Sequence, residues 1–149
     1  MNDLPSLSRR RLRRPPLLAW LRVARVFQKI AGASARSFRE YGLTVAQFDV
    51  LAHVGAAPGV TQQELAEALL VTKGNISQLL TRLEQAGMLE RQQEGRTNCL
   101  ALTAAGQELI DQVVPVNEML LDELFAPLSA DEQRELVRLL RKLDQQIDV

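Results

Sequence analysis

A short segment between residues 72 and 87 carries polar side chains in a pattern suited to making specific hydrogen bonds. Its apolar residues recur at i, i+3, i+4 and i+7, the spacing of one buried helical stripe. The opposite face is built mostly from amides and hydroxyls, which both donate and accept hydrogen bonds, where an ordinary solvated face has Glu and Lys. The stripe is Ile76, Leu79, Leu80 and Leu83, and the polar face is Asn75, Ser77, Gln78, Thr81, Arg82 and Gln85.

Start and stop signals place several helices around this segment. The capping boxes 44-TVAQ-47 and 61-TQQE-64 predict two short helices, one ending near Val54 and the next at Leu69. A tight LLVT link then leads to Thr72, the N-cap residue of the polar helix, which Gly87 ends. The two helices before Gly87 are therefore expected to pack as a helix-turn-helix.

A β-hairpin is predicted directly after these helices. The segments MLERQQ and RTNCLALT alternate as short strands, and Glu94-Gly95 between them favours a tight turn. Helix, turn, helix and hairpin is the order of a winged helix-turn-helix, whose second helix enters the major groove of DNA. In that groove, amide side chains pair with adenine and arginine pairs with guanine. Lys73 favours a phosphate at the start of the helix, and Gly74 leaves room for the sugar-phosphate backbone to come close. The alternative is a neutral solvated face.

Longer helices flank the winged segment, so the fold class is mostly α with a small β-hairpin. We predict helices at about 17–40 and 103–125, the second kinked or split by Pro115, and a last helix opened by 129-SADE-132. Their apolar stripes favour pairing with a second copy of the chain, while an intramolecular bundle is the alternative.

Composition and charge limit the function classes. The 149 residues suit one domain, one cysteine excludes an internal disulfide, and no apolar run is long enough to span a bilayer. A cytoplasmic location with no membrane partner is expected. The net charge of zero hides an asymmetry, because residues 1–40 contain ten basic and two acidic residues, whereas residues 107–149 contain four and ten. One end is therefore expected to face a polyanion.

The N-terminus is rich in arginine. We expect a disordered basic tail over 1–16, in which Arg9, Arg10, Arg11, Arg13 and Arg14 either follow DNA phosphates or remain solvated. A secretory signal is excluded because Arg22, Arg25 and Lys29 interrupt the apolar run, and a transit peptide is the remaining alternative.

The run TQQELAEALLVTKGNISQLLTRLEQAGMLER, with EGRTNCLALTAAG after it, resembles the MarR family of transcriptional regulators. The likeness rests on Leu65-Ala66, on RLE at 82–84, on G-x-L-x-R at 87–91 and on LT-x-x-G before the long helix. It implies a 17–149 domain in which 17–43 and 107–149 dimerise and 44–106 forms the DNA-binding lobe.

The resemblance also implies residue roles. Ser77 and Arg82 match DNA contacts, Arg91 the arginine at the wing base, Arg96 the wing arginine that reaches the minor groove, and Glu94 the acid that steadies the wing. The hairpin is about three residues shorter than the family's usual wing, which makes a phosphate contact by Arg96 the alternative.

Small aromatic effectors often bind MarR-like proteins, so a ligand pocket is expected to be lined by aromatic residues and the single histidine. The candidates are Trp20, Phe27, Tyr41, Phe48 and His53, with an ordinary core role as the alternative. Cys99, in the second strand, is expected to be a passive residue.

No set of residues suggests an enzyme, a metal site or a cofactor, because the chain has one His, one Cys and no phosphate loop. The sequence thus predicts a homodimeric regulator that binds double-stranded DNA at a pseudo-palindromic operator. The alternative is a winged-helix module for protein–protein interaction without sequence-specific DNA binding. Repression relieved by a small ligand is the expected mode of action.

Overall fold

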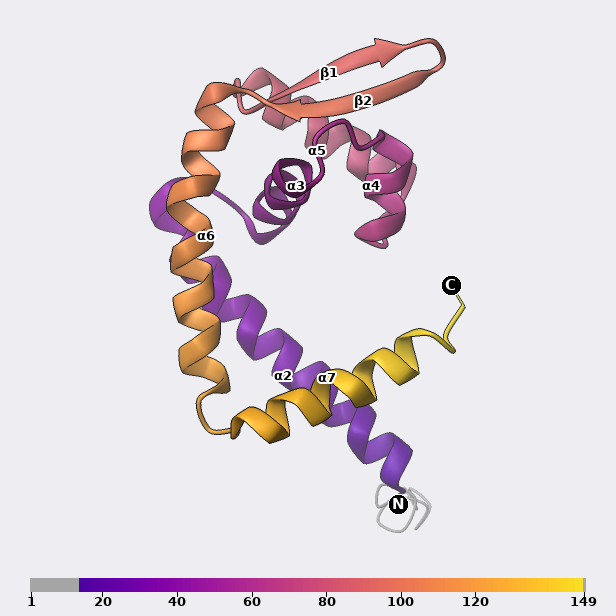
Figure 1. The fold of residues 1–149 in the computed structure, drawn as a ribbon, viewed down its shortest axis with the longest axis vertical. Helices are drawn as coiled ribbons and strands as arrows, with labels where there is room; N and C mark the ends of the chain where they lie inside the picture. The colour runs from indigo at the N-terminus through magenta and orange to yellow at the C-terminus, as the bar shows by residue number, and fades with distance from the viewer. Residues whose placement is uncertain (1–13, 149) are drawn as a thin grey trace, which may run out of the picture. The chain divides into compact units, whose positions relative to one another are not determined.

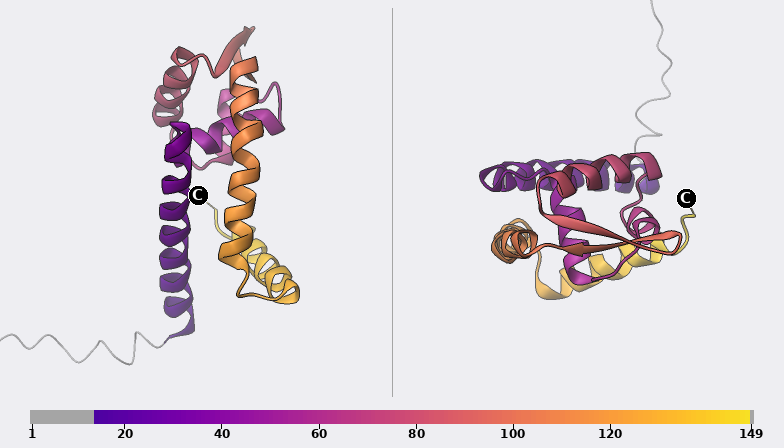
Figure 2. Two further views of the ribbon diagram at one scale, coloured as in Figure 1. Left: turned by 90° about the vertical axis from the view of Figure 1, so that its left-hand side faces the viewer. Right: turned by 90° about the horizontal axis from the view of Figure 1, so that it is seen from above.

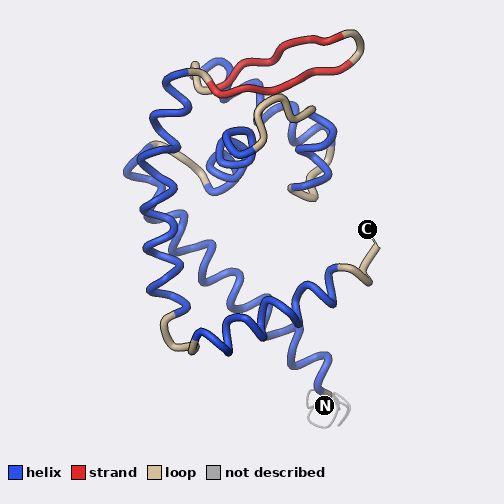
Figure 3. The backbone as a smooth tube through the Cα atoms, viewed as in Figure 1, coloured by secondary structure: helices blue, strands red, loops and turns tan. Residues whose placement is uncertain are grey.

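The structure is a computed structural model, and it describes residues 14–148. The chain divides into two compact units, one ending at Val45 and the other starting at Ala46. Helices account for most of both, and the strands form a single hairpin (Figures 1 and 3). The tail arginines from Arg9 to Arg13 lie outside the described residues.

The first unit is one long helix, α2 (Pro15–Phe38), followed by a 3₁₀ turn, η1 (Arg39–Tyr41). Its two prolines stand in the first turn, where the missing N–H groups would have had no helical acceptor. Gly42, at φ 70°, ends the segment, and the Leu43 N–H donates to the Phe38 carbonyl. The expected helix over 17–40 is therefore present, with its last residues wound more tightly.

The second unit begins with three helices: α3 (Val45–Ala56), α4 (Gln62–Ala68) and α5 (Lys73–Gln85). Thr61 and Glu64 form the predicted capping box of α4, and the Thr72 hydroxyl accepts from the Asn75 N–H at the start of α5. Leu65, Ile76 and Leu80 are at most 1 % exposed, so the apolar faces of α4 and α5 lie in the core of this unit.

The link between α4 and α5 contains a backbone conformation that the sequence did not indicate. Leu70 has φ 53°, in the left-handed region that glycine usually occupies, and its side chain is 77 % exposed. The exposed leucine makes the tight turn between the two helices without adding to the core.

Strands β1 (Leu89–Glu94) and β2 (Thr97–Leu102) pair antiparallel, from Leu89 opposite Leu102 to Glu94 opposite Thr97. Gly95, at φ 64°, supplies the first central residue of the two-residue turn. The segment before α4 also joins this sheet, because the Leu100 N–H donates to the Val60 carbonyl and the Gly59 N–H donates to the Leu100 carbonyl, each at 2.9 Å. The start of α4 is thereby fixed beside β2.

Helix α6 (Ala104–Phe125) runs unbroken through Pro115, so of the two predicted outcomes the split does not occur, and a kink at Pro115 stays a prediction. Proline removes the N–H that would bond to the Asp111 carbonyl, and Asp111 is exposed, so water can take that place. Thr103 caps the helix and also bonds through its N–H and hydroxyl to the Met88 and Gly87 carbonyls. This junction joins α6 to the start of the hairpin.

The last helix, α7 (Ala130–Asp144), begins with the predicted capping box of Ser129 and Glu132. It starts at the end of α6 opposite the hairpin (Figures 1 and 2). The Gln133 amide donates to the Phe125 and Leu128 carbonyls, which fixes the corner between α6 and α7. None of its residues is buried: Leu136 is half-buried, and Val137, Leu139, Leu140 and Leu143 are exposed.

Candidate nucleic-acid interface

The polar face of α5 is open to solvent. Asn75, Gln78 and Arg82 are exposed, while Ser77 and Thr81 are half-buried. Gly74 has no atom within 4 Å of the place where a β-carbon would stand, so the first turn of α5 presents open backbone. Exposed amide and guanidinium groups on a rigid helix are the groups that bind base edges in a major groove.

Thr81 and Arg91 connect this helix to the wing. The Arg91 guanidinium donates to Thr81 Oγ1 at 2.7 Å and to the Glu84 carboxylate at 3.4 Å, and the Thr81 hydroxyl donates to the Ser77 carbonyl at 2.9 Å. Only 19 % of the Arg91 side chain is exposed. These bonds give both residues a positioning role; whether they also contact DNA stays a prediction.

Glu84 was not selected from the sequence as a site residue. Besides its side-chain bond to Arg91, its carboxylate accepts from the Arg91 backbone N–H at 3.2 Å. In the sequence, Glu84 and Arg91 are seven residues apart. That spacing does not predict a contact unless the path of the turn at Gly87 between them is known.

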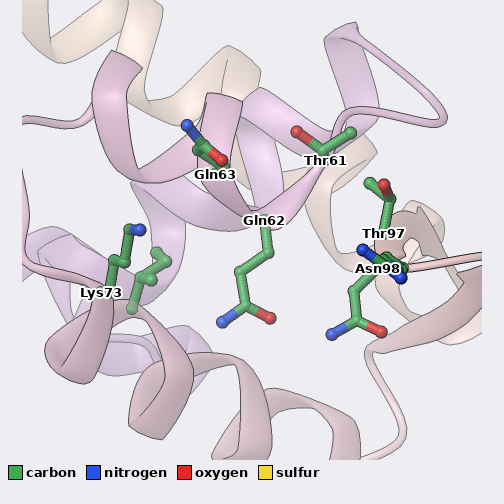
Figure 4. Close-up of a pocket in the computed structure, with 8 residues that line it drawn as sticks. Thr61, Gln62, Gln63, Lys73, Thr97 and Asn98 are labelled. Carbon is green, nitrogen blue, oxygen red and sulfur yellow. The ribbon is translucent and has the colours of Figure 1, made fainter.

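A cleft of about 260 Å³ lies where the starts of α4 and α5 meet the beginning of β2. Two cations line it, Lys73 on α5 and Arg96 in the wing turn, together with the amides of Gln62 and Asn98 (Figure 4). Lys73 and Arg96 were predicted from the sequence. Gln62 and Asn98 were missed, because nothing in their spacing places α4 beside β2.

A second cleft, of about 360 Å³, runs along the other side of α5. Asn75, Gln78 and Arg82 line it, and so does Asp49 of α3. Burial raises the pKa of the Asp49 carboxyl above its ordinary value. Three of the predicted DNA-binding residues therefore border a hollow that also contains an acid.

The five residues proposed for an effector pocket have different environments. Trp20 and Phe27 are 65 % and 70 % exposed on α2, Tyr41 and His53 are half-buried, and Phe48 is buried. Neither of the clefts described above is lined by any of them. An effector pocket formed by these residues stays a prediction.

Cys99 lies on β2, half-buried, with its Sγ 3.7 Å from the Glu94 carboxylate. Burial and the negative charge of Glu94 raise the pKa of the Cys99 thiol. Glu94, at the end of β1, therefore acts on this thiol, and the role that the resemblance implies for it, steadying the wing, stays a prediction.

Two further properties concern the part of the chain that the structure describes. No helix within residues 14–148 is long and apolar enough to cross a membrane. Over the same residues, no group of three or more His, Cys, Asp or Glu side chains is arranged to hold a metal ion.

Two short helices at a tight turn, followed by a hairpin and with an exposed polar second helix, define a winged helix-turn-helix protein. Comparison with known proteins gives the family: the sequence model described as MarR family matches residues 41–97. The chain belongs to the MarR family of transcriptional regulators.

Individual relatives agree over most of the chain. An uncharacterized HTH-type transcriptional regulator of Bacillus cereus is 35 % identical over 127 residues, covering 85 % of this chain and 86 % of its own. Transcriptional regulator HosA of Escherichia coli O157:H7 is 32 % identical over 104 residues, covering 68 % and 77 %. A cysteine-to-serine variant of E. coli MarR, solved in complex with operator DNA, superimposes with a TM-score of 0.77 at 31 % identity, covering 87 % and 94 %.

Proposed function

We propose that this regulator binds a specific double-stranded DNA site through the exposed face of α5. The observation that carries the proposal is the orientation of Asn75, Gln78 and Arg82, which point to solvent on the helix that a winged helix-turn-helix inserts into the major groove. The complex of the related E. coli MarR variant with operator DNA supports it. Lys73, Gly74, Ser77 and Arg96 would bind the neighbouring backbone.

The binding form that we propose is a homodimer. Large apolar side chains are exposed on three helices, α2, α6 and α7, and a single chain leaves them in water. The charges are complementary as well, because α2 has four basic and no acidic residues and α6 has five acidic and no basic ones. The exposed apolar residues of these helices are Leu18, Trp20, Leu21, Val23, Val26 and Phe27 on α2, Met119 and Leu124 on α6, and Val137, Leu139, Leu140 and Leu143 on α7.

A two-fold dimer presents its two α5 helices about 34 Å apart, the separation of successive major grooves, and so it would bind a pseudo-palindromic operator. We further propose that the dimer represses transcription and that a small aromatic ligand relieves repression. Trp20 offers a direct reporter, because it is the only tryptophan and it is exposed. Its fluorescence should respond to an aromatic ligand that binds beside it.

The deciding experiment is the selection of tight-binding duplexes from a random DNA pool at physiological salt. The expected product is an inverted repeat with half-site centres about 10 base pairs apart. Gln78→Ala should relax sequence preference, because an amide that reads a base edge is lost. Arg96→Ala should weaken binding to all sequences alike, because a phosphate or groove-edge contact carries little sequence information.

The competing function, a module that binds another protein, gives a different result. DNA binding should weaken steeply as salt rises, whereas a largely apolar protein contact should not. If neither the Gln78 nor the Arg96 substitution changes affinity for the selected duplex, the DNA-binding assignment fails.

A further inference from the structure

The cleft between α4, α5 and the wing has the properties of a site for one anion. Lys73 and Arg96 both line it, and neither forms an ion pair with another described residue. The nearby carboxylates of Glu64 and Glu94 are bonded to the Thr61 N–H and the Cys99 thiol, and neither lines the cleft. Its charged lining is therefore entirely positive.

One atom in the cleft lacks a hydrogen bond. Oε1 of Gln62 is buried and has no partner among the described residues. Gln62 lies between Lys73 and Asn98, both of which carry N–H donors (Figure 4). An unpaired buried oxygen destabilises the fold, so a state that brings a donor to it is favoured. An anion that draws the Lys73 ammonium or the Asn98 amide into the cleft supplies such a state.

The walls of the cleft are held in fixed positions. The Val60–Leu100 backbone bond and the Thr61–Cys99 bridge attach the start of α4 to β2. The short turn places Arg96 directly after Gly95 and two residues before Asn98, which lies on β2. A longer wing would carry its tip arginine away from α4, whereas this one keeps Arg96 at the cleft.

We propose that this cleft binds one phosphodiester group of the duplex backbone and that Lys73 and Arg96 neutralise its charge. The side chains of Gln62 and Asn98 position the donor groups of these two cations. This inference rests on the proposed DNA-binding function. It adds Gln62 and Asn98 to the interface and assigns Arg96 to the backbone. If α5 enters the major groove, the DNA strand between that groove and the wing would pass this cleft.

The test uses the full-length protein and the selected duplex, prepared as a set in which each member has one phosphate replaced by a neutral methylphosphonate. We expect one position in each half-site where neutralisation weakens the wild-type protein about tenfold. Lys73→Gln should weaken binding to the unmodified duplex to a similar degree. At that position, the Lys73→Gln variant should bind the modified duplex no more weakly than it binds the unmodified duplex, because the contact has already been lost.

If the affinity losses caused by Lys73→Gln and by the methylphosphonate are independent at every position, they multiply to about a hundredfold, and the proposal is overturned. Lys73→Arg should preserve the coupling, because it keeps the charge. Lys73→Gln should also lower the salt dependence by about 0.9 log units per log salt for each cleft. Arg141→Gln on α7, which removes one exposed cation outside the cleft, should leave both the coupling and the salt slope unchanged.

Gln62→Met separates a binding role from a structural one. Methionine has a similar length and no unpaired oxygen, so the melting temperature should stay the same or rise while affinity for the duplex falls severalfold. Unchanged affinity would remove Gln62 from the site. If the wild-type protein selects no duplex, the proposed function fails; if it selects one but shows no coupled phosphate, only the cleft assignment fails.

Discussion

Nη2 of Arg91 lies 2.7 Å from Oγ1 of Thr81, and this bond joins the base of the wing to the middle of α5. The threonine hydroxyl donates in turn to the Ser77 carbonyl one helical turn earlier. Because the hydroxyl has one proton, Thr81 cannot donate to a base while this geometry holds. The residue sets the angle between helix and wing.

The first prediction concerns the strength of this link. In a double-mutant cycle of Arg91→Ala and Thr81→Val, we expect a coupling of about 1 kcal/mol in the free energy of unfolding. Urea denaturation measures it. The exposed pair of Arg138 and Glu135 provides the matched cycle, where the expected coupling is below about 0.5 kcal/mol. Equal couplings in the two cycles would contradict a structural role for Thr81.

The second prediction concerns Gly106, the glycine of LT-x-x-G. A β-carbon there would stand 1.9 Å from the Met88 carbonyl oxygen, a backbone atom that cannot move without displacing the hairpin. We expect Gly106→Ala to cost more than about 3 kcal/mol of unfolding free energy. Gly74→Ala, whose added β-carbon would stand in open space on α5, should raise the free energy of unfolding by about 0.5 kcal/mol. A mild effect at Gly106 would show that α6 can shift relative to Met88.

The third prediction concerns pH. Hydrogen bonds from the Thr61 backbone and side chain lower the pKa of Glu64 below its ordinary value of 4.5. A lowered folded-state pKa stabilises the protein above that ordinary value, and this stability is lost as the pH falls through the folded pKa. Relative to Glu64→Gln, the wild type should therefore lose stability on acidification below pH 4.5. Thermal melts in which wild type and Glu64→Gln differ by the same melting temperature at every pH would refute this.

The fourth prediction concerns Cys99. Because burial and the charge of Glu94 raise the pKa of the Cys99 thiol above its ordinary value, little of the reactive thiolate is present at pH 7. Alkylation by iodoacetamide should therefore be slow at neutral pH and accelerate in alkali. Glu94→Gln should speed it at pH 7, because one of the negative charges that oppose the thiolate is removed. Fast alkylation of the wild type at pH 7 would mean that the thiol is more exposed and more acidic than this geometry implies.

Local signals in the sequence were sufficient to predict the helices and the hairpin. The boxes at Thr61 and Ser129 and the turn at Gly95 each involve residues at most three apart. The same holds for the buried stripe of α5, where Ile76, Leu80 and Leu83 are at most 2 % exposed. Short-range patterns of this kind fix an element before any tertiary contact forms.

The features that the sequence did not indicate depend on contacts between distant elements. The Glu84–Arg91 pair needs the turn at Gly87, and Gln62 meets Asn98 only because Val60 pairs with Leu100. Pro115 indicated a kinked or split helix, and the flanking turns continue the helix through it without a split. The left-handed Leu70 also had no signal, because leucine rarely adopts that conformation.

The junction at Met88 has a consequence for regulation. Thr103 bonds to both Gly87 and Met88, which are the residues that end α5 and lead into β1. A shift of the first turn of α6 is therefore transmitted to the end of α5 and the start of the hairpin together. In the proposed DNA-binding mode, a signal that tilts α6 would weaken the groove contact of α5 and the backbone contact of the wing in a single step, so release would follow the tilt angle steeply rather than in stages.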